Sequence, residues 1–448
     1  MNIFHSTDWE TRPSSSSRTA RGTTQRVRSR VVDSEGIRRK ANVFLLLGFA
    51  IREFFSFWTG HPTDFELWVR LGYAMTHGGD PYGVLPVVPG LSFANVFGYL
   101  NAPTIAYLPF WPLITGLIYI LYSAVGWDNR FFYYFLLKQP IIFGDVGLAY
   151  LMFSFVYARK PESNSLWVLS FWLFSPFTII ISGIWGMFDS IAISFVFLSI
   201  MSSKQVKMAL WEGLAIFAKT IPIIYAVPIT MKRPRNLWAA LLAVTVAILL
   251  SIVTFAAMGW PFSLAITTVE STAFKGNWSM SAWDIVYYLN YLSLLPNLSP
   301  QMYETLGLLW VPAIIVFTWV AIRRFRSQLE YGLIQSLLVC TLAFLIFKAR
   351  VTEQYGLYLF ALAAVDVAMW HPERKRLLFI TTAVAMIYLV VNNFFFVRFL
   401  SPVYPGFVGF ENEVNATIGS IRLAVISLSG TAFTCLNIKY LADVLKRR

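Results

Sequence analysis

The sequence has little charge, few cysteines and few histidines. Only 13% of its 448 residues are charged, about half the share found in soluble domains, whereas 57% are hydrophobic. This shortage excludes a single soluble globular body, a disordered chain and a fibrous protein. Two cysteines exclude a disulfide framework and a cysteine-rich metal site, and four histidines are too few for a multi-histidine metal centre.

The sequence instead contains long runs of apolar residues. Several reach the roughly 20 residues that cross a bilayer as a helix. The apolar segments are 42–59, 104–125, 136–157, 164–182, 188–203, 208–231, 237–258, 307–322, 332–347, 354–370, 377–398 and 418–438. Unsatisfied backbone groups are too costly in lipid, so each segment must be helical. We predict an all-α polytopic membrane protein with about 10–12 transmembrane helices.

Basic residues are segregated along the chain. Residues 1–41 carry nine Arg and Lys against four Asp and Glu, and they contain no apolar run. We interpret them as a disordered, basic cytoplasmic tail before a transmembrane domain at 42–448. An orientation signal that also attracts anionic lipid is favoured over nucleic-acid binding.

The loops predict the orientation. Short basic clusters occur near 159–160, 204–207, 232–235, 323–326, 374–376 and 446–448. The long loops 60–103, 259–306 and 399–417 hold eight acids and two bases, so they should face outward and both termini should be cytoplasmic. Three glycosylation sequons, at Asn277, Asn297 and Asn415, agree because they lie in these loops. We expect the plasma membrane or the endoplasmic reticulum.

Two segments conflict with a simple alternation. Either 104–125 and 208–231 both cross once, which leaves four basic residues outside, or neither makes a net crossing. Prolines near the start of the first segment, and Lys219, Pro222 and Pro228 in the second, favour broken helices without a net crossing.

Acidic residues follow the first apolar segment. Asp64 and Glu66 stand two positions apart, and residues 67–75 have the apolar spacing of an interfacial helix that ends at a turn over 78–82. One acid could instead cap that helix. Further along, Asp189 follows Trp185 and could also be a helix cap.

Cations are the other unusual feature of these outward ends. Lys219 could meet a phosphate or pair with an acid such as Asp145. Lys348 and Arg350 form a basic patch on the side where bases are rare, so a phosphate would explain them. The structural alternative is a simple pair between Arg350 and Glu353.

One outward face thus combines acids with cations. The acids are Asp64, Glu66, Asp80 and Asp189, and the cations are Lys219, Lys348 and Arg350. A carboxylate can take a proton from a sugar hydroxyl, and cations can stabilise a leaving phosphate. Glycosyl transfer from a lipid-phosphate sugar needs both.

The order of these motifs resembles a known family. It is similar to the GT-C class of membrane glycosyltransferases, and within it to GPI mannosyltransferases and their prokaryotic relatives, over about residues 42–370. The residues that carry the resemblance are Asp64-Phe65-Glu66, Gly78-Gly79-Asp80-Pro81-Tyr82, Lys138-Gln139-Pro140 with Asp145, Trp185-Gly186-Met187-Phe188-Asp189, Phe217-Ala218-Lys219 with Pro222, and Val351-Thr352-Glu353-Gln354-Tyr355.

The resemblance implies an inverting glycosyltransferase, first of all a mannosyltransferase. It would move a hexose from a dolichyl- or polyprenyl-phosphate sugar to a lipid-linked or glycan acceptor on the extracytoplasmic face, with no nucleic-acid partner. The general base would be Asp64, with Glu66 beside it. The donor phosphate would be bound by Lys219, Lys348, Arg350, Glu353 and Gln354. The acceptor would be bound or supported by Asp80, Asp189, Trp185 and Tyr82.

Departures from the family pattern limit these roles. The acidic pair reads Asp-x-Glu rather than Asp-x-Asp, which leaves open a divalent cation (Mg or Mn) held by Asp64 and Glu66. Thr352 stands where relatives often have His, and Met187 where they often have Gln. His61 is not expected to bind metal.

Two other classes of function compete with an enzyme. One is a non-enzymatic lipid carrier or flippase, and the other is a scaffold subunit of a glycosyltransferase complex. Transporters tend to have paired internal halves and acids at mid-membrane depth, whereas no repeat is found here and the acids stand at helix ends.

Overall fold

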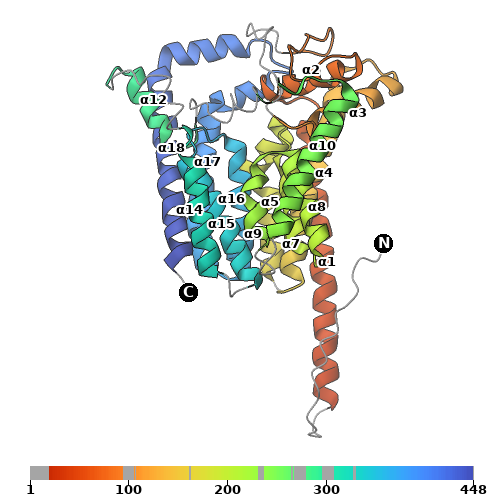
Figure 1. Ribbon diagram of the computed structural model, residues 1–448, viewed down its shortest axis with the longest axis vertical. Helices are drawn as coiled ribbons and strands as arrows, with labels where there is room; N and C mark the ends of the chain where they lie inside the picture. Colours follow the sequence, from red (N-terminus) through yellow and green to blue (C-terminus); the bar gives the residue numbers. More distant parts are fainter. Residues whose placement is uncertain are drawn as a thin grey trace.

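The chain folds into a bundle of helices. The computed structural model describes residues 20–93, 105, 107–160, 163–230, 237–263, 266, 279–294, 307–325 and 329–446, and regular structure within these ranges is helical throughout. The helices stand side by side, with α2 lying across one end (Figure 1). The predicted all-α fold of a polytopic membrane protein is therefore confirmed.

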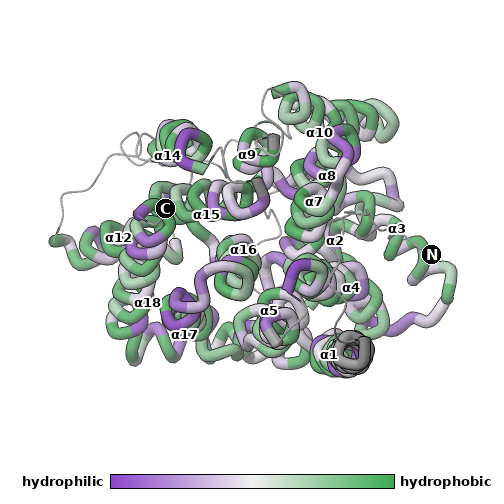
Figure 2. The backbone as a smooth tube through the Cα atoms, turned by 90° about the horizontal axis from the view of Figure 1, so that it is seen from below, coloured by the Kyte–Doolittle hydropathy of each residue, from purple (hydrophilic) through white to green (hydrophobic). Residues whose placement is uncertain are grey.

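Apolar side chains face outward on peripheral helices. On α10 (Leu237–Met258), Leu241 is 60% exposed and Val253 is 63% exposed. α14 (Trp310–Phe325) likewise exposes Ile315 at the edge of the bundle (Figure 2). Such a belt is unfavourable in water and suits a lipid surround.

Five helical stretches in the described ranges are individually long and apolar enough to cross a membrane. They are Arg130–Tyr157 (α4), Leu237–Met258 (α10), Glu330–Phe347 in α15 (Leu329–Phe347), Pro372–Asn392 with α17 (Lys375–Asn392), and Phe407–Lys446 (α18). Asn164–Phe174 and Pro176–Trp185 make a sixth if this pair, bent by 48°, is one span. The predicted 10–12 spans are not reached on this measure, because the remaining apolar segments form helices that are shorter, broken or partly polar.

The other helices complete the bundle. They are α1 (Ala20–Ser56), α2 (Asp64–Thr76), α3 (Phe110–Val125), α5 (Ser163–Phe174), α6 (Pro176–Ile179), η3 (Ile180–Trp185), α7 (Asp189–Met201), α8 (Gln205–Ala218), η4 (Ile221–Tyr225), α9 (Ala226–Thr230), α12 (Trp283–Tyr291), α14, η5 (Glu353–Tyr355), α16 (Gly356–Met369), η6 (Pro372–Arg374) and η7 (Phe394–Leu400).

Some predicted boundaries differ from the structure. α1 begins at Ala20, so the described part of the predicted tail 1–41 is helical rather than without structure. α12 and the start of α18 occupy parts of the predicted loops 259–306 and 399–417. Asn415 is exposed on α18, whereas Asn277 and Asn297 lie outside the described residues.

The two ambiguous segments take different forms in the structure. α3 packs along α2, where Gly72 meets the Thr115 carbonyl (Figure 1). α8 runs to Lys219, after which η4 and α9 turn back beside α15, with the Tyr225 hydroxyl 2.7 Å from that of Thr341. The second segment is therefore a broken helix, as predicted, and the first is one short helix, α3. The number of membrane crossings that each segment makes stays a prediction.

Basic side chains hold helix ends together at one end of the bundle. At one end Arg159 pairs with Glu330 at 2.6 Å, and Arg374 donates to the Asp443 carbonyl at 2.9 Å, which ties together the ends of several helices. The start of α1 and the end of α18 point to this same end, opposite α2 (Figure 1). The side of the membrane that each end of the bundle faces stays a prediction.

Candidate active site

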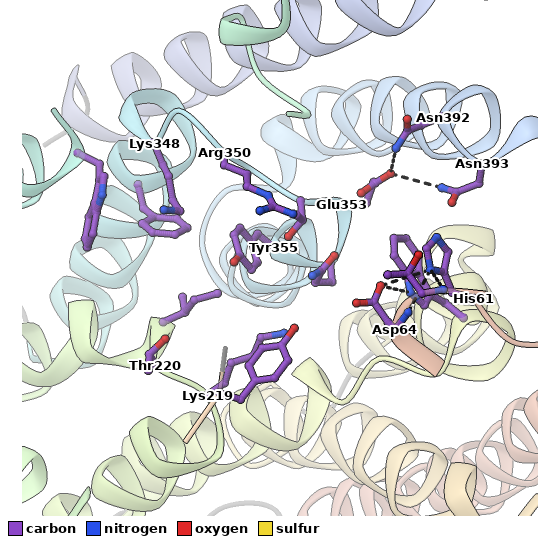
Figure 3. Close-up of a pocket in the computed structure, with 18 of the residues that line it drawn as sticks. His61, Asp64, Lys219, Thr220, Lys348, Arg350, Glu353, Tyr355, Asn392 and Asn393 are labelled. Atoms are coloured by element: carbon purple, nitrogen blue, oxygen red, sulfur yellow. Dashed lines mark hydrogen bonds and ion pairs between the residues drawn. The ribbon is translucent and has the colours of Figure 1, made fainter. Parts of the chain in front are cut away.

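A polar cavity of about 630 Å³ lies at the α2 end of the bundle. Its size suits a small-molecule ligand or the head of a lipid. Figure 3 shows side chains converging on it from the α1–α2 connection, the start of η4, the α15–η5 connection and the end of α17. Trp185 of η3 and Arg422 of α18 also line it.

Asp64 is the acid at one side of this cavity. It is the first residue of α2, and its Oδ2 accepts a 3.0 Å hydrogen bond from Trp185 Nε1. Its side chain is 26% exposed. Burial raises the pKa of Asp64, while the Trp185 bond and the charges of Lys219 and Arg350 oppose that rise. A carboxylate with a raised pKa is a stronger base when ionised.

Asp64 does not cap its helix. The N-cap residue is Thr63, which makes no side-chain capping bond, and the Asp64 carboxylate points to Trp185 instead. The capping alternative is therefore wrong for Asp64, and its side chain is free for chemistry in the cavity.

His61 supports Asp64 and is neutral. Its Nδ1 accepts from the backbone N–H groups of Thr63 and Asp64 at 3.3 and 3.4 Å, and its ring stacks on Trp185 at 4.6 Å. Burial and nearby Arg398 hold the pKa of His61 well below its usual value. His61 therefore orders the turn that carries Asp64.

Four predicted site residues do not line the cavity: Glu66, Asp80, Tyr82 and Asp189. Glu66 pairs with Arg70 at 2.7 Å and accepts from the backbone N–H of Phe93 at 3.0 Å. Two positions along a helix turn a side chain to a different face, so Glu66 points away from Asp64. Asp80 accepts from the Tyr82 backbone N–H within its turn, and the Tyr82 hydroxyl donates to the Tyr107 carbonyl.

The proposed metal pair of Asp64 and Glu66 is accordingly not formed. Within the described ranges, no group of three or more His, Cys, Asp and Glu side chains is arranged to hold an ion. The residues present do not fit a two-carboxylate metal site, and no chemical step is assigned to a metal.

Lys219 reaches the cavity from the break between α8 and η4. Its Nζ lies 2.5 Å from Asp189 Oδ2, at the start of α7, and 5.1 Å from the Tyr107 ring centre. The predicted alternative partner was wrong, because Asp145 pairs with Arg52 at 2.6 Å. Asp189 thus supports Lys219, whose charge it offsets.

Lys348 and Arg350 form the wall opposite Asp64 (Figure 3), and Gln354 also lines the cavity. Lys348 lies 5.3 Å from the Trp310 ring centre, and burial, with Arg350 nearby, lowers the pKa of Lys348 to about 8. Arg350 Nε and Gln354 Oε1 are buried without a hydrogen-bond partner in the described residues. Buried polar atoms are normally satisfied, so this wall is suited to a polar ligand.

Glu353 is held by amides and not by Arg350. Its Oε1 accepts from Asn392 Nδ2 at 2.7 Å and, more weakly, from Asn393 at 3.4 Å (Figure 3). The predicted pair of Arg350 and Glu353 is therefore not formed. Burial raises the pKa of Glu353.

Several lining residues were missed from the sequence, among them the polar residues Asn392, Asn393, Arg398 and Arg422. These four follow the stretch covered by the family resemblance. A signal existed for Arg422, since a charge inside the apolar segment 418–438 is a functional candidate by the rule already applied to Lys219. The position of Arg398 could not be predicted, because the chain changes direction after Asn393, where Phe394, Phe395 and Phe396 adopt positive φ.

Lys138 anchors the segments that carry Asp64 and Trp185. Its buried Nζ donates to the Thr59 carbonyl and hydroxyl, each at 2.8 Å, and to the carbonyls of Gly183 at 2.8 Å and Ile184 at 3.0 Å. Lys138 is thus a positioning residue outside the cavity. Next to it, Gly186 has φ +91°, and a Cβ there would meet Phe65 at 2.8 Å.

Comparisons with known proteins give little beyond this geometry. No protein-family model and no curated protein matches the chain. Among solved structures, it is similar to ArnT from Cupriavidus metallidurans bound to undecaprenyl phosphate, with 13% sequence identity, a TM-score of 0.47, and coverage of 90% of this chain and 77% of that one. This likeness is too distant to indicate a function, which must come from the cavity itself.

Proposed function

We propose that the cavity is the active site of an inverting glycosyltransferase. Its donor would be a polyprenyl- or dolichyl-phosphate hexose, with mannose as the first candidate from the motif resemblance, and its acceptor an alcohol of a lipid or glycan. The observation that carries the proposal is that Asp64 and the Lys348–Arg350 wall line one cavity.

The proposed base and the proposed phosphate site suit each other. Asp64 is polarised by the Trp185 hydrogen bond and has room for an acceptor hydroxyl. Arg350, with its buried Nε lacking a partner, and Lys348 would bind the leaving phosphate. Lys219 would contribute less, because Asp189 already offsets its charge. The nearby side chains of Ile223, Ile224 and Phe344 would contact the first isoprene units.

The proposed reaction is a single displacement. Asp64 takes the proton of the acceptor hydroxyl, and that oxygen bonds to the anomeric carbon from the face opposite the phosphate. The bond between the anomeric carbon and the phosphate oxygen breaks, and its electron pair leaves with the polyprenyl phosphate. The phosphate is a good leaving group, so no separate acid is needed.

A donor panel tests the proposal. Purified full-length protein is incubated with membrane lipid extract and labelled polyprenyl-phosphate mannose, polyprenyl-phosphate glucose, or their nucleotide-sugar counterparts. We expect transfer only from a lipid-phosphate sugar. Transfer only from a nucleotide sugar would refute both the donor and the extracytoplasmic site.

The non-enzymatic alternatives give other outcomes in the same preparation. A lipid carrier would move labelled lipid between the leaflets of proteoliposomes without forming product. A scaffold subunit would do neither, while still assembling with partner proteins. Sugar transfer by the isolated chain distinguishes the enzyme from both.

A further inference from the structure

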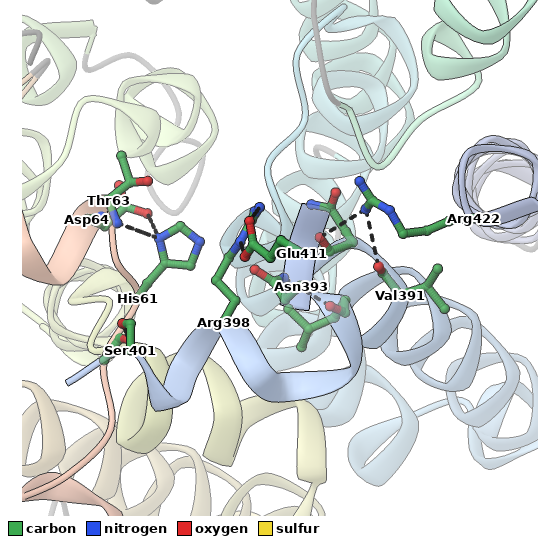
Figure 4. A network of polar contacts seen from close by, with 12 residues as sticks. His61, Thr63, Asp64, Val391, Asn393, Arg398, Ser401, Glu411 and Arg422 are labelled. Atoms are coloured by element: carbon green, nitrogen blue, oxygen red, sulfur yellow. Dashed lines mark hydrogen bonds and ion pairs between the residues drawn. The ribbon is translucent and has the colours of Figure 1, made fainter. Parts of the chain in front are cut away.

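A second cationic region of the cavity surrounds Arg422. In Figure 3, Arg350 lies on one side of Glu353 and Asn392 on the other. Arg422 belongs to the Asn392 side, since its Nη1 donates to the Val391 and Asn392 carbonyls, both at 3.4 Å. Figure 4 shows Arg398 between His61 and this arginine. The region is thus separate from the Lys348–Arg350 wall.

The two arginines differ in how their charge is balanced. Arg398 makes a two-point ion pair with Glu411, at 2.7 and 3.0 Å. Arg422 is only 5% exposed, and it forms no ion pair within the described ranges. Its guanidinium carbon lies 3.9 Å from the Phe394 ring centre, and its Nε is buried without a hydrogen-bond partner.

Burial of such an arginine costs free energy unless an anionic group binds it. A desolvated charge needs an opposite charge or full hydrogen bonding, and two long bonds to carbonyls supply neither. A guanidinium that lines a cavity with a donor unused is suited to an oxyanion such as phosphate. Binding of the terminal carbonyls of α17 is the structural alternative, but it leaves Nε unexplained.

We propose that Arg422 binds an anionic group of the acceptor, a phosphate or a similar oxyanion, while the acceptor hydroxyl meets Asp64. This inference rests on the proposed function and names the chemical class of its acceptor. The cavity then holds two anions, with the donor phosphate at Lys348 and Arg350 and the acceptor anion at Arg422. Glu353, with its amide partners, lies between them and keeps the two anions apart.

Phosphate binding tests this without requiring turnover. Purified full-length protein in neutral detergent is first saturated with geranyl phosphate, which should occupy the apolar-lined donor side. Inorganic phosphate is then titrated by calorimetry. We expect it still to bind, and to bind at least about tenfold more weakly in R422Q. R323Q is the matched control, since Arg323 stacks on Trp319 and does not line the cavity.

Several results would overturn the inference. One is loss of inorganic phosphate binding once geranyl phosphate is bound. Another is a phosphate affinity in folded R422Q that differs from the wild-type affinity by less than about threefold. If R422Q fails to fold, R422K decides: it keeps the charge but not the two-point geometry, so binding should weaken severalfold, and unchanged binding refutes the subsite. Arg422-dependent binding without sugar transfer would instead count against the proposed function and leave the subsite standing.

Discussion

Replacing Asp64 with asparagine removes the proposed base and little else. An asparagine Oδ1 can still accept the hydrogen bond that Trp185 Nε1 makes at 3.0 Å, so the local structure should persist. General-base catalysis contributes about 10²- to 10⁴-fold, so D64N should raise the barrier by about 3–5 kcal/mol. Donor affinity should stay equal or improve slightly, because a negative charge leaves a cavity that binds phosphate.

The assay separates chemistry from binding. Single-turnover transfer from labelled polyprenyl-phosphate mannose gives the rate, and competition with polyprenyl phosphate gives donor affinity. D80N is the matched control, because Asp80 is outside the cavity and an asparagine keeps the turn bond to Tyr82. Retention of more than a tenth of the wild-type rate in folded D64N would refute Asp64 as the base, as would equal losses of rate and donor affinity.

Further predictions concern neighbouring groups. Lys348 has a pKa of about 8, so its side chain is charged below that pH. The affinity for polyprenyl phosphate should therefore fall severalfold between pH 7 and pH 9. A pH-independent affinity, or the same pH dependence in K348M, would contradict this. W185F keeps an aromatic ring stacked on His61 but loses the hydrogen bond to Asp64. The pKa of Asp64 should therefore rise further, and the acid limb of the pH–rate profile should move to higher pH. The rate at neutral pH should fall about tenfold. K138M leaves four oxygen acceptors without their donor and should lower the free energy of unfolding by about 2–5 kcal/mol. In detergent, K138M should therefore unfold at a lower temperature than K348M. Because Glu66 pairs with Arg70 and does not join Asp64 in a metal site, chelation should not abolish sugar transfer; complete, cation-reversible loss would show that a metal is required.

Local sequence features predicted much of the fold. Apolar segments became helices because lipid or a packed core rewards burial of their side chains and intrahelical bonding of their backbone. The interfacial helix α2 and its turn at Gly78 followed from apolar spacing and glycine. Lys219 and the prolines after it predicted the break that brings a cation to the cavity.

Other features depended on contacts that spacing does not reveal. Glu66 was grouped with Asp64 by nearness in sequence, but the helix turns its carboxylate to Arg70. The structural alternative for Lys219 was a pair with an acid such as Asp145, yet the packing of α7 against α8 presents Asp189 instead. In both cases the partner depends on which face of a helix a side chain occupies and on which helix lies against it.

The sequence by itself determined that this chain is a helical membrane protein with ionisable groups at the ends of its helices, because scarcity of charge and the length of apolar runs are properties of composition. Only the tertiary structure decided which of those groups share a cavity. Asp64 and Arg422 lie more than 350 residues apart in the sequence, and both line the same cavity as Glu353 and Asn392. They meet because the starts of α2 and η5, the end of α17 and the part of α18 that follows its kink at Ile418 come together at one level of the bundle. Helix packing and the turn at Phe394–Phe396 set that level, and no local pattern encodes it.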